Sequence, residues 1–141
     1  MPDFKDFAEE YAAAWSTQDI DAILSFFTKD CVYEDMALGA VNTGKQQLGA
    51  FLRATFAAIP DFRIELKAIL SSGDRAASEW IMSGTQTGAF PGIPATGKRF
   101  SVRGASMMEL HQGKIRRNAD YWSLATLLQQ VGVLPDSPAV P

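Results

Sequence analysis

The chain has 141 residues, 47% of them hydrophobic and 21% charged, which predicts one globular domain and excludes disorder over most of its length. Its 13 Lys and Arg against 16 Asp and Glu give a net charge of -3. This charge argues against nucleic acid as the main partner, because phosphate neutralisation needs a basic surface.

The cysteine and histidine content excludes other classes. Cys31 is the single cysteine, so no internal disulfide can form, and one His with one Cys cannot make a zinc site. The motifs GxxxxGK[ST], GxGxxG and GxSxG are absent. We therefore expect no metal and no cofactor. The first six residues lack a signal-peptide pattern and no apolar run is long enough to span a membrane, so we expect a cytoplasmic protein that does not bind membranes.

Helical spacing of apolar residues predicts four helices. In the first, apolar residues recur on one face from Phe4 to Trp15, and Asp3 can cap its start. The polar residues 28–30 are expected to break the second helix, and Pro60 ends the third. The predicted helices are 3–15, 20–27, 45–59 and 124–131.

After Pro60 the apolar period changes from that of a helix to that of a strand. A Gly-Asp turn at 73–74 and a Gly- and Pro-rich loop at 88–98 separate the strand candidates. Residues 39–44 are expected to form a loop. The predicted strands are 31–35, 62–68, 75–87, 100–110 and 114–122.

This order of elements predicts an α+β domain. A long, curved antiparallel or mixed sheet wrapped over the N-terminal helices leaves a cone-shaped cavity, which is the default ligand site. We expect one domain over residues 1–133 and a Pro-rich tail over 134–141.

The register of the last hairpin depends on its turn. A three-residue turn at 111–113 makes Ser106 face the same way as Asn118 and Asp120. A two-residue turn puts Met107 there instead. We favour the three-residue turn, with Arg116, Asn118, Asp120 and Trp122 on one face.

The run GTQTGAFPGIPATGK at 84–98 resembles the G-T-x-T-G…G-x-P-x-T-G-[KR] motif of SnoaL-like polyketide cyclases and ester cyclases. The segments 113–115, 120–122 and 127–132 fit the ending of the same family. The resemblance covers nearly the whole chain. It implies the NTF2-like cone fold, usually assembled as a homodimer.

The front half also resembles ketosteroid isomerase, another member of that superfamily. Tyr11 lies in an alignable position, and Asp35 falls on that enzyme's general base. Ketosteroid isomerase combines an Asp base with an oxyanion hole made of a Tyr and a protonated Asp. Ser106 stands at the position of the protonated Asp, and its hydroxyl is a weaker donor.

Asp120 is the first candidate for acid–base chemistry. It lies in mid-strand, where Asp is disfavoured, and an apolar cavity would raise its pKa toward the range that proton abstraction needs. The SnoaL-like resemblance also implies an acid/base Asp on this strand, within about one pleat of Asp120. The alternative is a structural Asp that pairs with Arg103, Arg116 or Arg117.

Two further residues complete the catalytic candidates. Asp35 is the last residue of its predicted strand. Its side chain is either a second carboxylate in the cavity or the start of a turn, where it accepts a hydrogen bond from the backbone that follows. The Tyr11 hydroxyl either stabilises an enolate oxygen or is satisfied in the core. Alternation and helical position supply the candidate substrate-binding residues Trp15, Phe51, Trp80, Met82, Ser106, Asn118 and Trp122.

The sequence thus predicts a cofactor-independent enzyme for a small hydrophobic carbonyl compound. Asp120 or Asp35 would remove a proton alpha to the carbonyl, and Tyr11, with Asn118 or Ser106, would hold the oxyanion. The outcome is an intramolecular aldol-type cyclisation or an isomerisation. The alternatives are a non-catalytic ligand-binding protein and a dimeric interaction module. Apolar residues on the other sheet face, such as Ile81 and Tyr121, predict a homodimer.

Overall fold

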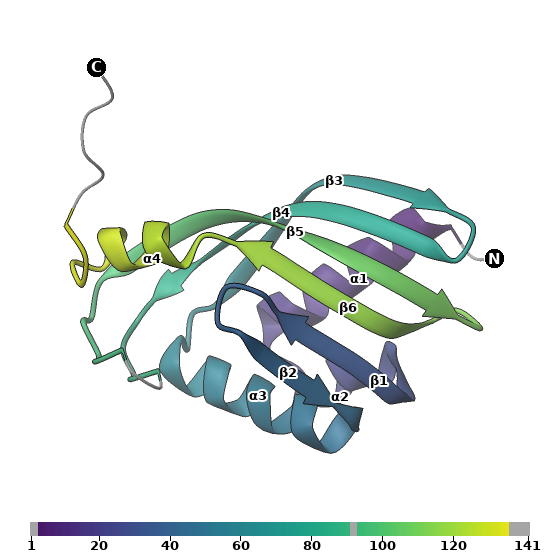
Figure 1. Cartoon of the computed structure of the whole chain (residues 1–141), viewed down its shortest axis with the longest axis horizontal. Coiled ribbons are helices and arrows are strands. Elements are labelled where there is room, and N and C mark those ends of the chain that lie inside the picture. Colours follow the sequence, from purple (N-terminus) through teal and green to yellow (C-terminus); the bar gives the residue numbers. More distant parts are fainter. Residues whose placement is uncertain (1–2, 91–92, 136–141) are drawn as a thin grey trace.

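The computed structural model describes residues 3–90 and 93–135 and has the expected α+β architecture (Figure 1). The expected Pro-rich tail lies, from residue 136 on, outside the described residues. The elements in chain order are α1 (Phe4–Thr17), α2 (Ile20–Ser25), β1 (Phe27–Asp35), β2 (Ala40–Thr43), α3 (Gly44–Ala58), β3 (Arg63–Ser72), β4 (Arg75–Thr85), β5 (Arg99–His111), β6 (Lys114–Trp122) and α4 (Leu124–Gln130).

The strands form one six-stranded mixed sheet in the order β2-β1-β6-β5-β4-β3. β1 pairs in parallel with β6, and the other neighbours are antiparallel. In Figure 1 the sheet curves, α1 lies behind it, and α3 runs beside β1 and β2. Because the helices cover one face, the side chains on that face enclose the core and the cavity.

The helix starts follow the sequence pattern. The Asp3 carboxylate accepts a hydrogen bond from the Lys5 amide, and Asp19 accepts one from the Ala22 amide. Such side-chain oxygens satisfy amides that a helix leaves unpaired at its start. No helix in the described part of the chain is long and apolar enough to cross a membrane.

The region after α2 corrects two predictions. Residues 28–30 do not form a break, because β1 begins at Phe27 and runs through them. Residues 40–43 of the expected loop form the edge strand β2 against the end of β1. β1 pairs with β6, which is distant in the sequence, and local periodicity carries no signal for such pairing; β2 is short and depends on β1.

The turn between β5 and β6 also differs from the prediction. His111 pairs with Lys114, which leaves a two-residue turn in which Gln112 and Gly113 both have positive φ. A β-bulge then shifts the register, so that Glu109 pairs with Arg117 while Leu110 pairs with Ile115. The bulge compensates for the shorter turn, so Ser106 pairs with Asp120 and faces the same way as Asn118 and Asp120, as predicted.

Because of the same bulge, Arg116 does not share a face with Asn118 and Asp120, contrary to the prediction from the sequence. Arg116 is the unpaired extra residue and is exposed, whereas Ile115 is fully buried in the core. Beyond the bulge, Asn118 and Asp120 are buried on the helix-covered side as expected.

Candidate active site

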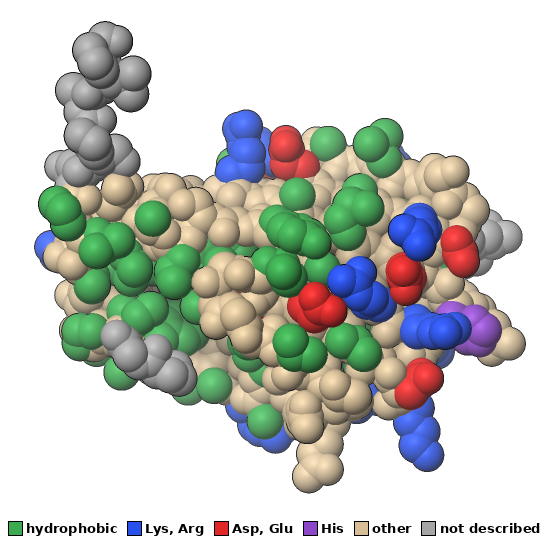
Figure 2. All heavy atoms as spheres, in the orientation of Figure 1, with side chains coloured by type: hydrophobic (Ala, Val, Ile, Leu, Met, Phe, Trp, Pro, Cys, Tyr) green, Lys and Arg blue, Asp and Glu red, His purple; other side chains and the backbone are tan. Residues whose placement is uncertain are grey.

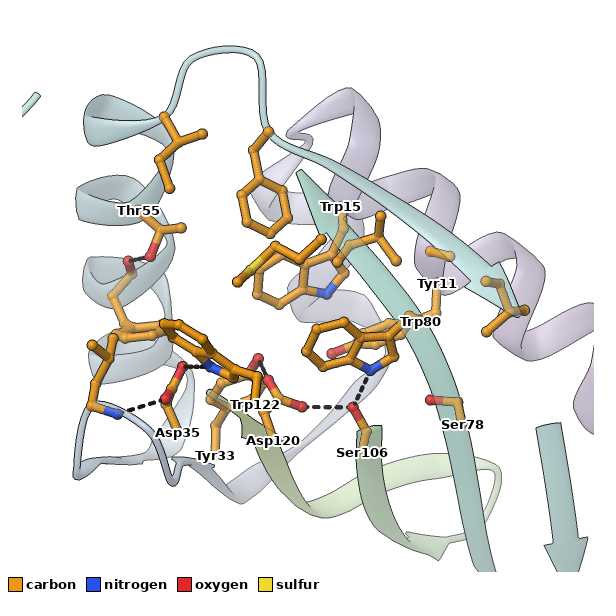
Figure 3. Close-up of a pocket in the computed structure, with 18 of the residues that line it drawn as sticks. Tyr11, Trp15, Tyr33, Asp35, Thr55, Ser78, Trp80, Ser106, Asp120 and Trp122 are labelled. Carbon is orange, nitrogen blue, oxygen red and sulfur yellow. Dashed lines mark hydrogen bonds between the residues drawn. The ribbon is translucent and has the colours of Figure 1, made fainter. Parts of the chain in front are cut away.

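A cavity lies between the sheet and the helices, and its wall is mostly apolar and aromatic (Figure 3). Among the described residues that line it, none is Lys, Arg or His. Within residues 3–90 and 93–135, no group of three His, Cys, Asp or Glu side chains could hold a metal ion. The polar side chains of the wall are Tyr11, Trp15, Tyr33, Asp35, Thr55, Ser78, Trp80, Ser106, Asp120 and Trp122.

Four of these polar residues form one row across the sheet. Asp35 pairs with Asp120, Asp120 with Ser106, and Ser106 with Ser78. The row crosses β1, β6, β5 and β4, so its members are spaced by one strand separation of about 4.8 Å. Strand pairing therefore places two carboxylates and two hydroxyls side by side in an otherwise apolar cavity.

Three neighbouring side chains donate hydrogen bonds to Asp120. The Ser106 hydroxyl (2.6 Å) and the Asn118 amide nitrogen (2.8 Å) both donate to Oδ1, and the Tyr33 hydroxyl donates to Oδ2. A carboxylate offers about four lone-pair sites, two on each oxygen. The acceptor site that remains free is therefore on Oδ2.

Burial raises the pKa of Asp120 from 3.8 to about 6. The donors Ser106, Tyr33 and Asn118 act in the opposite direction, because they favour the charged form, and the nearby Asp35 carboxylate raises the pKa further. No arginine pairs with Asp120 among the described residues, so the structural ion pair considered from the sequence is not what holds it. A carboxyl with this pKa can accept and return a proton near neutral pH.

Asp35 combines both alternatives considered from the sequence. Its Oδ1 accepts a hydrogen bond from the Leu38 amide at 2.9 Å, as a turn-initiating Asp does. Its Oδ2 accepts one from the Trp122 indole at 3.1 Å, and the side chain lines the cavity. Burial raises the pKa of Asp35, and the hydrogen bonds from Leu38 and Trp122 oppose that effect.

Two buried donors in the cavity wall, the Tyr11 hydroxyl and the Trp15 indole nitrogen, make no full hydrogen bond to a described residue, although the Trp15 indole lies close enough to the hydroxyl to oppose the rise of the Tyr11 pKa. They lie one helical turn apart on α1, and their rings pack edge to face at 6.2 Å. Burial raises the pKa of Tyr11 well above its usual value, so the hydroxyl keeps its proton. Unpaired buried donors are unusual in proteins, and a binding cavity is where a ligand can satisfy them.

The loop after β4 closes one side of the cavity with Phe90 and Ile93. Gln86 is fully buried beneath it, donates a hydrogen bond to the Pro94 carbonyl at 2.9 Å, and accepts one from the Thr96 hydroxyl at 2.7 Å. The loop lies within the 84–98 motif noted in the sequence. Its glutamine and threonine thus hold a cavity wall in place.

The structure brings most of the predicted site residues to the cavity. Asp120, Asp35 and Tyr11 line it, as do Trp15, Phe51, Trp80, Met82, Ser106 and Trp122. Asn118 is the exception: it is buried outside the lining, and its amide donates to Asp120. Ser106 and Asn118 therefore support Asp120: the single Ser106 hydroxyl proton is used on Oδ1, and Asn118 lies outside the cavity lining.

Sequence reasoning missed Tyr33, which touches Asp120 directly. A signal for it existed, because Tyr33 lies two residues before Asp35 and alternation puts both on the same face of the strand. The hydroxyls of Ser78 and Thr55 in the cavity wall were also missed.

The chain belongs to the SnoaL-like polyketide cyclase family, whose model matches residues 5–131. Cyclase aurE of Calcarisporium arbuscula is 33% identical over 116 residues, which are 79% of this chain and 82% of that protein. Nogalonic acid methyl ester cyclase of Streptomyces nogalater is 27% identical over 123 residues, 85% of this chain and 90% of that protein.

A solved structure supports the fold. It is a Catenulispora acidiphila protein with a ketosteroid isomerase-like fold in complex with trimethylamine, at 27% identity and a TM-score of 0.80. The match covers 94% of this chain and 96% of that one. The family and the fold expected from the sequence are both confirmed.

Proposed function

We propose that the protein is a cofactor-independent cyclase in which Asp120 removes a proton alpha to a carbonyl of a small hydrophobic substrate. The observation that carries the proposal is the Asp120 carboxylate itself. It is buried in an apolar cavity, has a pKa of about 6, and keeps one acceptor site free on Oδ2. These properties suit a general base that works near neutral pH. The membership in a cyclase family supports the same interpretation.

The proposed reaction conserves every atom of the substrate. Asp120 Oδ2 takes the alpha proton, and the electron pair of the broken C–H bond forms an enolate. The enolate carbon attacks a second carbonyl of the same molecule, which forms the new C–C bond and an alkoxide. The alkoxide then takes the proton back from Asp120, so the product is a cyclic hydroxyketone isomeric with the substrate.

The enolate needs a donor for its oxygen, and α1 offers two donors in the cavity wall that make no full hydrogen bond to a described residue. Because Ser106 and Asn118 donate to Asp120, Tyr11 is assigned the oxyanion role, with the Trp15 indole N–H as second donor. Positioned donors of this type stabilise developing negative charge in a site from which water is excluded.

Hydrogen–deuterium exchange tests the first step without knowledge of the natural substrate. 2-Tetralone, a bicyclic aromatic ketone, is incubated in D2O with wild-type protein or with Asp120→Asn, and alpha exchange is followed by proton NMR. We expect wild type to accelerate exchange above the buffer rate and Asp120→Asn to lose the acceleration. Saturable ligand binding to wild type without any acceleration would support the non-catalytic ligand-binding alternative.

We further propose that two copies associate through the outer face of the sheet. Met107 on β5 and Tyr121 on β6 project there with 45% and 46% of their surfaces exposed. They are near neighbours, since Met107 pairs with Ala119 and Tyr121 with Ala105. Figure 2 shows hydrophobic side chains grouped over this part of the molecule, with charged side chains beside them. Such a patch suits a two-fold interface.

Light scattering tests the assembly at micromolar concentration. We expect a dimer mass for wild type and a monomer mass for Tyr121→Arg. Ala13→Arg is the matched control, because Ala13 is exposed on α1, which lies behind the sheet and away from its outer face (Figure 1). A monomer mass for wild type would contradict the proposal.

A further inference from the structure

Trp80 is tied to Asp120 although the two side chains have no direct hydrogen bond. The Trp80 indole nitrogen donates to the Ser106 hydroxyl oxygen at 2.9 Å, and that hydroxyl donates to Asp120 Oδ1 at 2.6 Å (Figure 3). All three groups are buried. The result is a chain of two hydrogen bonds across β4, β5 and β6.

Chemistry fixes which group donates in each of these two hydrogen bonds. An indole N–H can only donate, and a serine hydroxyl has one proton together with lone pairs that accept. The Trp80 N–H occupies the side of the Ser106 oxygen that faces the indole, so the hydroxyl proton cannot point there. It points toward Asp120 instead. The same hydroxyl without Trp80 could rotate away from the carboxylate.

A glycine creates the space for this arrangement. Gly104 pairs with Trp80 across β4 and β5, and a Cβ at Gly104 would lie 2.3 Å from the indole Cη2 and 2.4 Å from Cζ3. The indole therefore lies over the backbone of β5, and its N–H reaches Ser106 two residues further along that strand. No other residue type at position 104 leaves this room.

We propose that Trp80 is a positioning residue for Asp120: with Gly104 beneath its indole, it locks the Ser106 hydroxyl as a permanent donor to Oδ1, so that the substrate proton is received on Oδ2. The inference rests on the proposed function of Asp120 as base. Coupled hydrogen bonds strengthen one another in a low-dielectric site, so the effect of Trp80 passes through Ser106.

A second tryptophan provides an internal comparison. Trp122 donates directly to Asp35, so each cavity carboxylate has one indole N–H assigned to it, one directly and one through a serine. The titratable groups that face Asp120 are Asp35 and Tyr33 from β1 and Tyr11 from α1. The lining residues of α3, β4 and β5 include none.

The test follows the titration of the Asp120 side-chain carboxyl carbon by NMR in 13C-labelled protein. Trp80→Phe keeps an aromatic ring but removes the N–H, and we expect the Asp120 midpoint to move to higher pH. Gly104→Ala is expected to shift it in the same direction, because the added methyl group displaces the indole. With a carbonyl substrate, the acidic limb of the kcat/KM profile should move up by the same amount.

Trp122→Phe is the matched control, since it makes the same change in the same cavity. It removes the donor to Asp35, so the Asp35 midpoint should rise. A neutral Asp35 no longer repels the Asp120 carboxylate, so the Asp120 midpoint should stay or fall. A rise of the Asp120 midpoint in Trp122→Phe equal to that in Trp80→Phe would overturn the inference.

A double-mutant cycle tests the route through Ser106. In a Ser106→Ala background, Trp80→Phe should produce no further shift of the Asp120 midpoint. The same shift in both backgrounds, or no shift in Trp80→Phe alone, would overturn the inference. The titration does not depend on turnover. If Asp120→Asn kept full activity while these shifts occurred, the proposed base would be wrong, and only the coupling of Trp80 to Asp120 through Ser106 would stand.

Discussion

Asp35 and Asp120 lie directly opposite each other on the parallel strands β1 and β6, although they are far apart in the chain. Asp35 is held by a backbone amide and an indole N–H, and Asp120 by two hydroxyls and an amide N–H. Burial raises the pKa of both, and the Asp35 carboxylate raises the pKa of Asp120 further.

This coupling gives a prediction for Asp35→Asn. Removal of the neighbouring negative charge should lower the pKa of Asp120, so the acidic limb of the kcat/KM profile moves to lower pH. Because the base remains, the plateau rate should stay within about tenfold of wild type, compared with losses of about 10²-fold or more for a missing general base. An unchanged acidic limb would show that the two carboxylates are not coupled.

Burial of Asp120 also predicts how stability depends on pH. The folded pKa of about 6 exceeds the ordinary value of 3.8, so between these pH values the folded state binds more protons than the unfolded state. The contribution of Asp120 to the free energy of unfolding is therefore complete below 3.8 and is lost as pH rises through about 6.

Urea unfolding of wild type and Asp120→Asn across this range measures the contribution. The variant lacks the titration, so it should gain stability relative to wild type as pH rises, by up to about 3 kcal/mol for a shift of roughly two units. A difference in unfolding free energy that stays constant with pH would mean that Asp120 titrates normally in the folded protein.

Tyr11→Phe should separate stability from activity. The hydroxyl makes no full hydrogen bond to a described residue, and only the Trp15 indole approaches it, so its removal relieves a buried polar group that costs about 1–3 kcal/mol. The ring packing against Trp15 and Phe26 is kept. We therefore expect an unchanged or higher melting temperature together with a loss of turnover of about 10²-fold, typical of a missing oxyanion donor. A variant with lower stability and normal turnover would identify Tyr11 as a structural residue.

Gln86→Ala is predicted to act on substrate binding. The Gln86 side chain makes hydrogen bonds with Pro94 and Thr96, which hold in place the loop that contains Phe90 and Ile93. The loss of these hydrogen bonds loosens one wall of the cavity. KM should rise while kcat changes less, because Asp120 and its donors lie on other strands. Steady-state kinetics check this, and a fall in kcat at constant KM would count against the assignment.

Much of the fold was predictable because the patterns are local. The change from helical to strand period after Pro60 is confirmed by β3 to β6. Alternation along 75–87 correctly placed Trp80 and Met82 on the cavity side. The parallel pairing of β1 with β6 was not predictable in the same way, because it joins segments that are distant in sequence.

The sequence predicts which residues belong to the site better than it predicts the hydrogen bonds between them. Alternation tells which side of a sheet a side chain faces, but not how far the cavity extends along the strand. Asn118 was therefore expected to contact substrate, whereas in the structure it lies outside the cavity lining and donates to Asp120. Ser106 was placed correctly although the predicted turn was wrong, because the bulge at Arg116 restored the register. The hydrogen bonds that Tyr33 and Trp80 make depend on tertiary distances that no sequence pattern encodes.

The most direct measurement of the central claim is the rate of carbonyl substrate turnover by Asp120→Asn against wild type. Circular dichroism and the melting temperature serve as the check that the fold is intact. The side chain keeps its shape and loses its basicity, so we expect a folded protein whose turnover falls by about 10²-fold or more. Turnover that survives in Asp120→Asn and is abolished in Asp35→Asn would contradict the assignment and make Asp35 the base, as in the ketosteroid isomerase resemblance.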